Sequence, residues 1–96
     1  MDRETILMHL KQYLASKKNL YHIDKLGLFG SYARGEASHE SDIDIVVDFT
    51  HADLYHQIGI KQDLEEHFGT HVDVIALWER INPKLLSRIE KDVIYV

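Results

Sequence analysis

Cysteine is absent from the 96-residue chain, and its absence excludes two kinds of structure. Without thiol groups the protein can form neither disulfide bonds nor a metal centre ligated by thiolates. Histidine is frequent, with seven residues, but no pair shows convincing metal-ligand spacing. We therefore interpret the histidines as surface or structural residues.

Long apolar segments are also missing. No hydrophobic run approaches the roughly 20 residues that a membrane-spanning helix requires, and the polar Met1 end has no signal-like stretch. There is no low-complexity tract, and 45% of the residues are hydrophobic, which suffices for a modest core. These features predict a cytoplasmic protein that folds as a single domain over residues 1–96.

Positive charge is scarce. The chain has 11 Lys and Arg residues against 16 Asp and Glu residues, which gives a formal net charge of −5. Proteins that bind nucleic acid usually carry a basic stripe, so this balance argues against a nucleic-acid partner. It does not exclude nucleotides, because metal ions can bridge their phosphates to acidic side chains.

Hydrophobic periodicity and turn residues divide the chain into alternating helices and strands. Asp2 or Thr5 can cap the first helix, and Gly30 breaks the first strand. Asn82-Pro83 is a strong helix start, with a capping residue before proline. The expected elements are helix 2–18, strand 23–29, short helix 31–36, strand 42–49, helix 54–68, strand 72–77, a helix from 83, and an apolar end 93–96 that extends that helix or docks against the sheet.

This order of elements predicts an α/β (α+β) fold, with a small mixed sheet of three to four strands and helices packed mainly on one face. The longer predicted helices each show an apolar stripe that would face the sheet. In helix 54–68 the stripe consists of Leu54, Ile58, Leu64 and Phe68.

Strand 42–49 carries a pair of carboxylates. Side chains alternate along a strand, so Asp42 and Asp44 share one face, with Cα atoms about 6.6–7 Å apart. Such carboxylates repel each other, and a divalent cation between them is the natural counter-charge. Oxygen ligands suit Mg²⁺, with Mn²⁺ as the alternative. Taken alone, an Asp-x-Asp pair more often marks the solvent side of an amphipathic strand, but Val46 shares this face.

Two further features accompany the aspartate pair. Gly30-Ser31 falls where a strand ends and a helix begins, and free N–H groups at a helix start attract phosphate. Serine adds a hydroxyl donor, and a plain capped turn is the alternative. Asp73 alternates with two valines and falls on the face of the aspartate pair if those valines are buried. Its alternative role is a charge that protects a sheet edge.

The order of these parts resembles that of a known family. Gly30-Ser31, a spacer of ten residues and Asp42-Ile43-Asp44, with a later aspartate at Asp73, match a specific signature. It is the signature of the minimal nucleotidyltransferases of the DNA polymerase beta superfamily. The similarity covers nearly the whole chain, and no position of the signature is missing.

The resemblance implies a role for each matching residue. Gly30-Ser31 would bind the β- and γ-phosphates of ATP or another NTP. Asp42 and Asp44 would be catalytic ligands of two Mg²⁺ ions, and Asp73 would complete the metal site and assist the nucleophile. Arg34 lies within the motif and is either a further phosphate contact or a solvated arginine at a helix end.

The resemblance also implies a partner. Many minimal nucleotidyltransferases are encoded beside a helical HEPN protein and act as antitoxins that transfer AMP to a tyrosine of that toxin. Larger superfamily members carry a second domain for the base and the acceptor, and this sequence shows none. We therefore expect a protein adenylyltransferase with a HEPN-type partner. One alternative is an antitoxin that neutralises its partner by contact alone. The other is a small-molecule or tRNA nucleotidyltransferase, and the negative charge counts against tRNA.

An apolar surface on the side of the aspartates fits a protein partner as well. Val46, Ile75 and Leu77 fall on this side of the predicted sheet. They require cover from the last helix, from a second copy of the chain or from a partner. We predict oligomerisation or complex formation.

Overall fold

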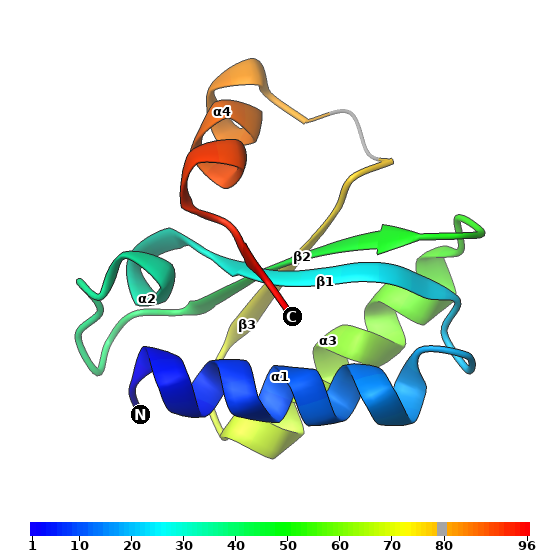
Figure 1. Ribbon diagram of the computed structural model, residues 1–96, viewed down its shortest axis with the longest axis horizontal. Coiled ribbons are helices and arrows are strands. Elements are labelled where there is room, and N and C mark those ends of the chain that lie inside the picture. The colour runs from blue at the N-terminus through cyan, green and yellow to red at the C-terminus, as the bar shows by residue number, and fades with distance from the viewer. Residues whose placement is uncertain (79–80) are drawn as a thin grey trace.

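The computed structural model describes residues 1–78 and 81–96 (Figure 1). The elements run in the order α1 (Arg3–Lys17), β1 (Ile23–Phe29), α2 (Gly30–Arg34), β2 (Ile43–Phe49), α3 (Leu54–Phe68), β3 (Val72–Ala76), α4 (Pro83–Asp92) and β4 (Ile94–Tyr95). This order is the predicted one, and β1 and α3 have the predicted bounds. The second strand begins one residue later than expected, so Asp42 precedes it.

The helix ends follow from local chemistry. Asp2, rather than Thr5, caps α1, because its carboxylate accepts a hydrogen bond of 2.8 Å from the Thr5 N–H. Asn82 caps α4 in the same way, with proline at the first turn as predicted. The short helix α2 ends earlier than predicted, because Gly35 adopts a left-handed φ of 72°.

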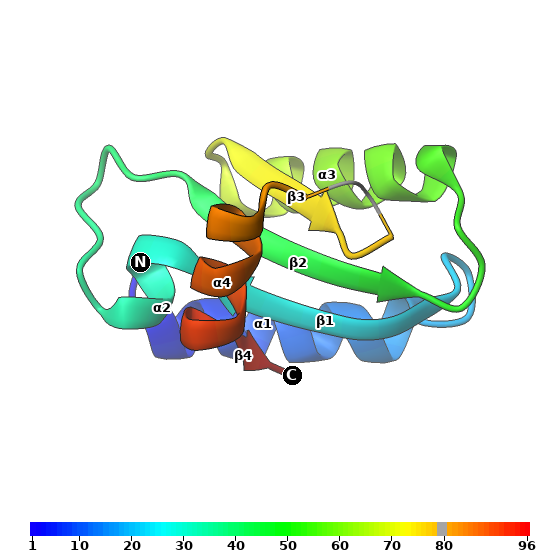
Figure 2. The ribbon, with the colours of Figure 1, turned by 90° about the horizontal axis from the view of Figure 1, so that it is seen from above.

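The sheet is four-stranded and mixed, with the order β3-β2-β1-β4. β1 pairs antiparallel with β2 and with β4, and β2 pairs parallel with β3. The apolar C-terminal end therefore docks against the sheet, which was one of its two predicted fates. Figure 2 shows the strands side by side from above, with α4 crossing over them.

The helices cover the two faces of the sheet unequally. In Figure 1, α1 and α3 lie together on one face and α4 lies alone on the other, so the predicted one-sided packing is confirmed. The main core fills the space between the sheet and the helix pair. Its fully buried members include Ile43, Ile45, Val47, Leu26, Leu28, Ile6, Leu10, Ile60 and Leu64.

The predicted apolar stripe of α3 is partly wrong. Leu54 and Ile58 are 58% and 42% exposed, whereas Ile60 and Leu64 are fully buried. The sheet-facing side of α3 includes polar side chains that bind the edge strand β3. The Lys61 ammonium donates a hydrogen bond to the carbonyl of Val72, 2.6 Å away, and the Gln57 amide likewise donates to a β3 carbonyl.

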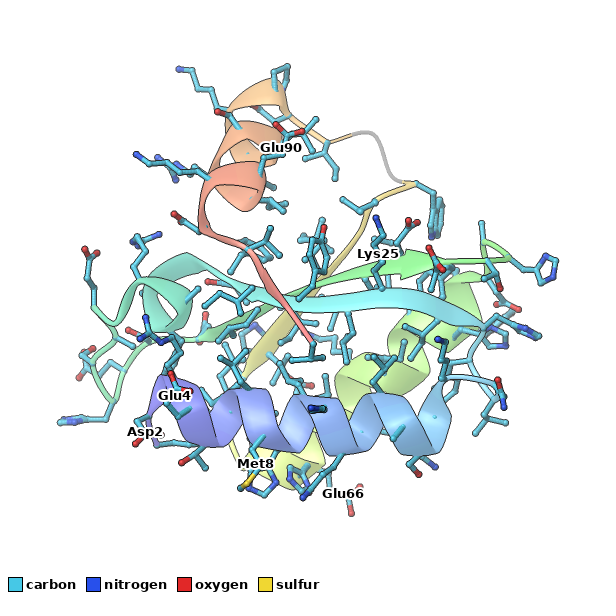
Figure 3. The ribbon with its side chains drawn as sticks, in the orientation of Figure 1. Asp2, Glu4, Met8, Lys25, Glu66 and Glu90 are labelled. Carbon is cyan, nitrogen blue, oxygen red and sulfur yellow. The ribbon has the colours of Figure 1, made fainter. Side chains whose placement is uncertain are left out.

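The α4 side of the sheet holds a second, smaller apolar cluster. Val46, Phe29 and Ile89 are its buried members, with Ile75 and Leu77 packed at its border. The last helix therefore covers Val46, which was one of the three covers considered. Figure 3 shows Lys25 on this side of the sheet, while Met8 and Glu66 point away from it beyond α1 and α3. Within residues 1–78 and 81–96, no helix combines the length and apolar character needed to cross a membrane.

Candidate active site

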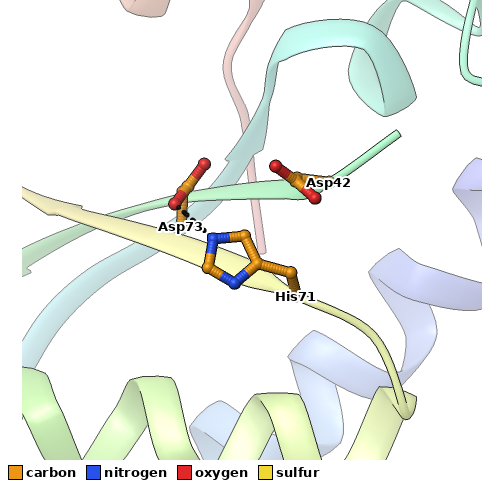
Figure 4. Close-up of side chains that lie close together, drawn as sticks. All are labelled: Asp42, His71 and Asp73. Atoms are coloured by element: carbon orange, nitrogen blue, oxygen red, sulfur yellow. Dashed lines mark hydrogen bonds and ion pairs between the residues drawn. The ribbon is translucent and has the colours of Figure 1, made fainter. Parts of the chain in front are cut away.

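Three carboxylates meet at the edge of the sheet where β2 and β3 begin. Because the two strands run parallel and in register, Asp44 lies directly opposite Asp73. Asp42 precedes β2 on the same side, and Figure 4 shows its carboxylate beside that of Asp73. The structure thus brings together the three aspartates that the sequence placed on one face.

The carboxylates disturb one another electrostatically. Burial, and next the negative charges of Asp73 and Asp42, raise the pKa of Asp44 to about 6. The charges of Arg34 and His71 oppose this rise but do not cancel it. The site therefore holds more negative charge than its own cations neutralise, which is the condition that favours a bound divalent cation.

Gly30 is required at its position for two reasons. Its φ of 76° is a left-handed conformation that side chains rarely adopt. A Cβ atom there would also overlap the Asp44 carboxylate. Glycine at position 30 thus allows the start of α2 to lie against Asp44. The side chain of Phe29, which precedes α2, does not cap the helix. The first N–H groups of α2 therefore have no acceptor from a capping side chain.

A cavity of about 300 Å³ opens beside the junction of β1 and α2. Its lining combines a glycine–serine turn, two carboxylates, two arginines and two apolar residues, namely Gly30, Ser31, Asp44, Asp92, Arg34, Arg88, Phe29 and Leu85. A ligand that carries phosphates and is accompanied by a metal ion suits this mixture, because it needs cationic and anionic contacts at once.

Arg34 lines the cavity, but its guanidinium is already engaged. Nη1 donates to an Asp92 oxygen at 2.6 Å, and Nε donates to Glu36 at 3.0 Å. The hydrogen bonds to Glu36 and Asp92 raise the pKa of Arg34. The residue therefore joins α2 to α4, and its contact with phosphate stays a prediction.

Arg88 is a cavity residue that the sequence reasoning did not single out. It lies on α4 and is exposed, and its side chain has no hydrogen bond or ion pair with another residue in the described parts of the chain. It precedes Asp92 by four positions, which places both on one side of the helix. That spacing could have signalled a shared role, but only the docking of α4 shows which site this side faces.

His71 lies at the surface, as interpreted from the sequence, and its ring also contacts the carboxylates of the site. Its Nε2 lies 3.0 Å from Asp73 Oδ1, and its Nδ1 lies 3.0 Å from Glu65 Oε2. Figure 4 shows the imidazole beside Asp73, with Asp42 across from it. One ligand atom from each of Asp42, His71 and Asp73 lies within 4.8 Å of the others, so this group could hold a metal ion.

Comparison with known proteins gives a consistent picture. Residues 7–96 match the Nucleotidyltransferase domain family. A candidate protein adenylyltransferase of Methanocaldococcus jannaschii is 38% identical over 90 residues, covering 91% of this chain and 90% of that protein. The protein adenylyltransferase MntA of Thermococcus cleftensis is 33% identical over 94 residues, covering 97% of this chain and 91% of that protein.

Solved structures share the fold. A structure described as a minimal nucleotidyltransferase superposes with a TM-score of 0.77 at 31% identity, covering 98% of this chain and 95% of that chain. A second structure contains a tri-AMPylated HEPN toxin of Shewanella oneidensis in complex with its MNT antitoxin. It superposes with a TM-score of 0.69 at 20% identity, covering 97% of this chain and 70% of that chain, which shows likeness of fold alone.

Proposed function

Because the chain belongs to the nucleotidyltransferase domain family, we propose that this nucleotidyltransferase moves AMP from ATP to a hydroxyl of a partner protein in a Mg²⁺-dependent reaction. Relatives that match over nearly their whole length bear the name protein adenylyltransferase. The observation that carries the proposal is the meeting of Asp42, Asp44 and Asp73 beside the cavity at Gly30-Ser31.

The donor atoms around the three carboxylates fit a hard divalent cation. Carboxylate oxygens are the ligands that Mg²⁺ and Mn²⁺ prefer. Burial, and next the negative charges of Asp73 and Asp42, raise the pKa of Asp44, and a bound cation would offset those charges. Asp42, Asp44 and Asp73 would hold the ions. Divalent ions bound there would neutralise the negative charge that develops as pyrophosphate leaves. Asp73 would also accept the proton of the attacking hydroxyl.

The cavity would provide the phosphate contacts. Gly30-Ser31 would bind the β- and γ-phosphates through backbone N–H groups and the serine hydroxyl. Arg88 is free to reach the same phosphates, since no described partner holds it. Arg34 would join only by loosening its contact with Asp92, so we assign Arg88 the larger share of phosphate binding.

A protein acceptor best suits this chain. The solved MNT antitoxin of the same fold is seen with a tri-AMPylated HEPN toxin. We infer a HEPN-type partner, modified on a tyrosine hydroxyl, for this chain too. The chain would then act as an antitoxin by blocking its partner covalently.

The direct test incubates the purified chain with its HEPN-type partner and ATP labelled on the α-phosphate. We expect label on the partner when Mg²⁺ is present and none after chelation. ATP labelled on the γ-phosphate should leave the partner unlabelled, because pyrophosphate departs. Label transferred from the γ-position instead would show a kinase and overturn the proposal.

Rescue of cells from the partner distinguishes covalent action from neutralisation by contact. A chain with both Asp42→Asn and Asp44→Asn should fail to protect cells that express the toxin. Full protection by this variant, at equal expression, would show that binding alone suffices and would favour the non-catalytic alternative.

A further inference from the structure

His71 sits between two carboxylates just before β3. Its ring nitrogens face opposite partners, with Nε2 3.0 Å from Asp73 Oδ1 and Nδ1 3.0 Å from Glu65 Oε2. The backbone is held as well, because the His71 carbonyl accepts a hydrogen bond of 3.2 Å from the N–H of Ile43 at the start of β2. The ring is thus placed at the edge where the aspartates converge.

Glu65 is a fixed anion rather than a solvated side chain of α3. Its Oε2 accepts the N–H of Val72 at 3.2 Å and lies 3.7 Å from the Lys61 ammonium. The anchored carboxylate therefore has a defined position from which to hold the imidazole.

A carboxylate on one imidazole nitrogen is the usual support of a metal-ligating histidine. When the Nδ1–H group donates a hydrogen bond to Glu65, the ring takes the tautomer whose Nε2 lone pair is available to an ion. That lone pair points to the side of Asp73 and Asp42, where one ligand atom from each residue lies within 4.8 Å of the others. Two ligand atoms that each lie about 2.0–2.2 Å from a shared ion are about 4.4 Å apart at most, so small side-chain rotations within this group would bring the three atoms onto one ion.

We propose that His71 Nε2 is a metal ligand beside Asp42 and Asp73, that Glu65 orients it, and that this nitrogen shifts the preference of the site from Mg²⁺ toward Mn²⁺. The inference rests on the proposed function, because it concerns the same metal site. Imidazole nitrogen binds transition-metal ions better than it binds Mg²⁺, whereas carboxylates serve both. The His71 nitrogen therefore helps to determine which metal ion the site prefers.

Electron paramagnetic resonance of Mn²⁺ bound to the full chain tests the ligand directly. We expect nitrogen hyperfine coupling in the spin-echo signal, and a change of its frequencies when histidine carries ¹⁵N. The coupling should vanish in His71→Asn, whose amide keeps a donor toward Glu65 but lacks the Nε2 atom. His51→Asn, altered after the opposite end of β2, should keep it and serves as the control.

Calorimetric titration tests the metal preference and the role of Glu65. The Mn²⁺ dissociation constant should rise at least about tenfold in His71→Asn and in Glu65→Gln, while that of Mg²⁺ changes less. His51→Asn should leave both constants unchanged. Equal losses for the two ions in His71→Asn would overturn the claim about metal preference.

Failure of this inference is distinguishable from failure of the proposed function. Mn²⁺ that binds without histidine nitrogen coupling, or with coupling that survives in His71→Asn, overturns the role of His71 and leaves the aspartate site standing. Mn²⁺ that does not bind, with or without added ATP, overturns both. Because His71 is 52% exposed, its replacement should not impair folding, which circular dichroism checks.

Discussion

Asp44 lies half-buried near two other carboxylates. In that position the ionised form of its carboxyl group destabilises the folded state. Its pKa of about 6 exceeds the ordinary 3.8, because burial and the charges of Asp73 and Asp42 disfavour its ionised form. The folded state therefore holds a proton that the unfolded state has released between these two values. Stability from this group is present at low pH and is lost as the pH rises through about 6.

Asp44→Asn should consequently stabilise the metal-free protein at neutral pH. The neutral amide removes the cost of the buried charge, by about 1–2 kcal/mol once solvent screening is allowed for. The gain should largely disappear near pH 4, where Asp44 of the wild-type chain is protonated in the folded state and increasingly so in the unfolded state. Urea unfolding at about pH 4 and about pH 8, with chelator present, measures it. Asp48→Asn, on the same face of β2, is the control, and an equal gain in that variant would contradict the account.

Gly30 and Gly69 form a matched pair for testing the turn. Both have left-handed φ angles, 76° and 67°, but only Gly30 has the Asp44 carboxylate against its missing side chain. Gly69→Ala should cost roughly 1 kcal/mol of stability and leave nucleotidyl transfer intact. Gly30→Ala should cost more and abolish transfer, because Asp44 must move. Thermal unfolding and partner labelling measure both effects, and equal behaviour of the two variants would count against the packing argument.

At the scale of elements, a shared carboxylate ties α1 and its C-terminal loop to α3. Asp63 accepts a hydrogen bond of 2.7 Å from the Tyr13 hydroxyl and one of 3.1 Å from the Tyr21 hydroxyl. Burial, then the hydrogen bond to Asp63, raises the pKa of Tyr13. The ring therefore stays neutral beyond the ordinary range of tyrosine and keeps its donor proton.

Removing one of these hydroxyls should weaken the α1–α3 contact. Tyr13→Phe should lower the free energy of unfolding by about 1–2 kcal/mol, since the bond is short, partly buried and made to a charged acceptor. Tyr21→Phe should cost less, because its bond is longer and its partner retains Tyr13. Urea titration of the two variants and of the double variant measures this order. A larger loss in Tyr21→Phe would reverse the assignment.

Element positions were largely predictable because local chemistry marks them. Asn82-Pro83 and Gly69 place helix ends through capping and left-handed geometry, which depend on neighbouring residues only. The buried side of α3 was less predictable. Its sheet-facing residues include Lys61, whose ammonium donates to a main-chain carbonyl of the edge strand β3. Hydrophobicity alone therefore wrongly predicted that Leu54 and Ile58 face the sheet.

At the scale of the whole molecule, exposed apolar side chains support association. Leu54, Tyr55 and Ile58 at the start of α3 are 58%, 84% and 42% exposed, and Trp78 is 46% exposed. We expect the chain to associate, either with itself or with its partner. Light scattering of the chain alone and mixed with the partner measures this. Monomeric mass in both samples would contradict the prediction.

Sequence order and the alternation of side chains along a strand predicted the aspartates of the site. Alternation placed Asp42 and Asp44 on one face, and Asp73 joins them through the parallel register of β2 and β3. His71 and Arg88 were beyond that reasoning. The role proposed for His71 depends on its contact with Glu65 across a turn, and the role proposed for Arg88 depends on the docking of α4. Neither contact follows from hydrophobic periodicity.

The central claim is that Asp42 and Asp44, at the start of β2, carry adenylyl transfer to a partner protein. The most direct test compares initial rates of partner labelling from α-labelled ATP for the wild-type chain, for Asp42→Asn with Asp44→Asn, and for the Asp48→Asn control. The account predicts a loss of at least about 100-fold in the double variant and a wild-type rate in the control. Full labelling by the double variant would contradict it.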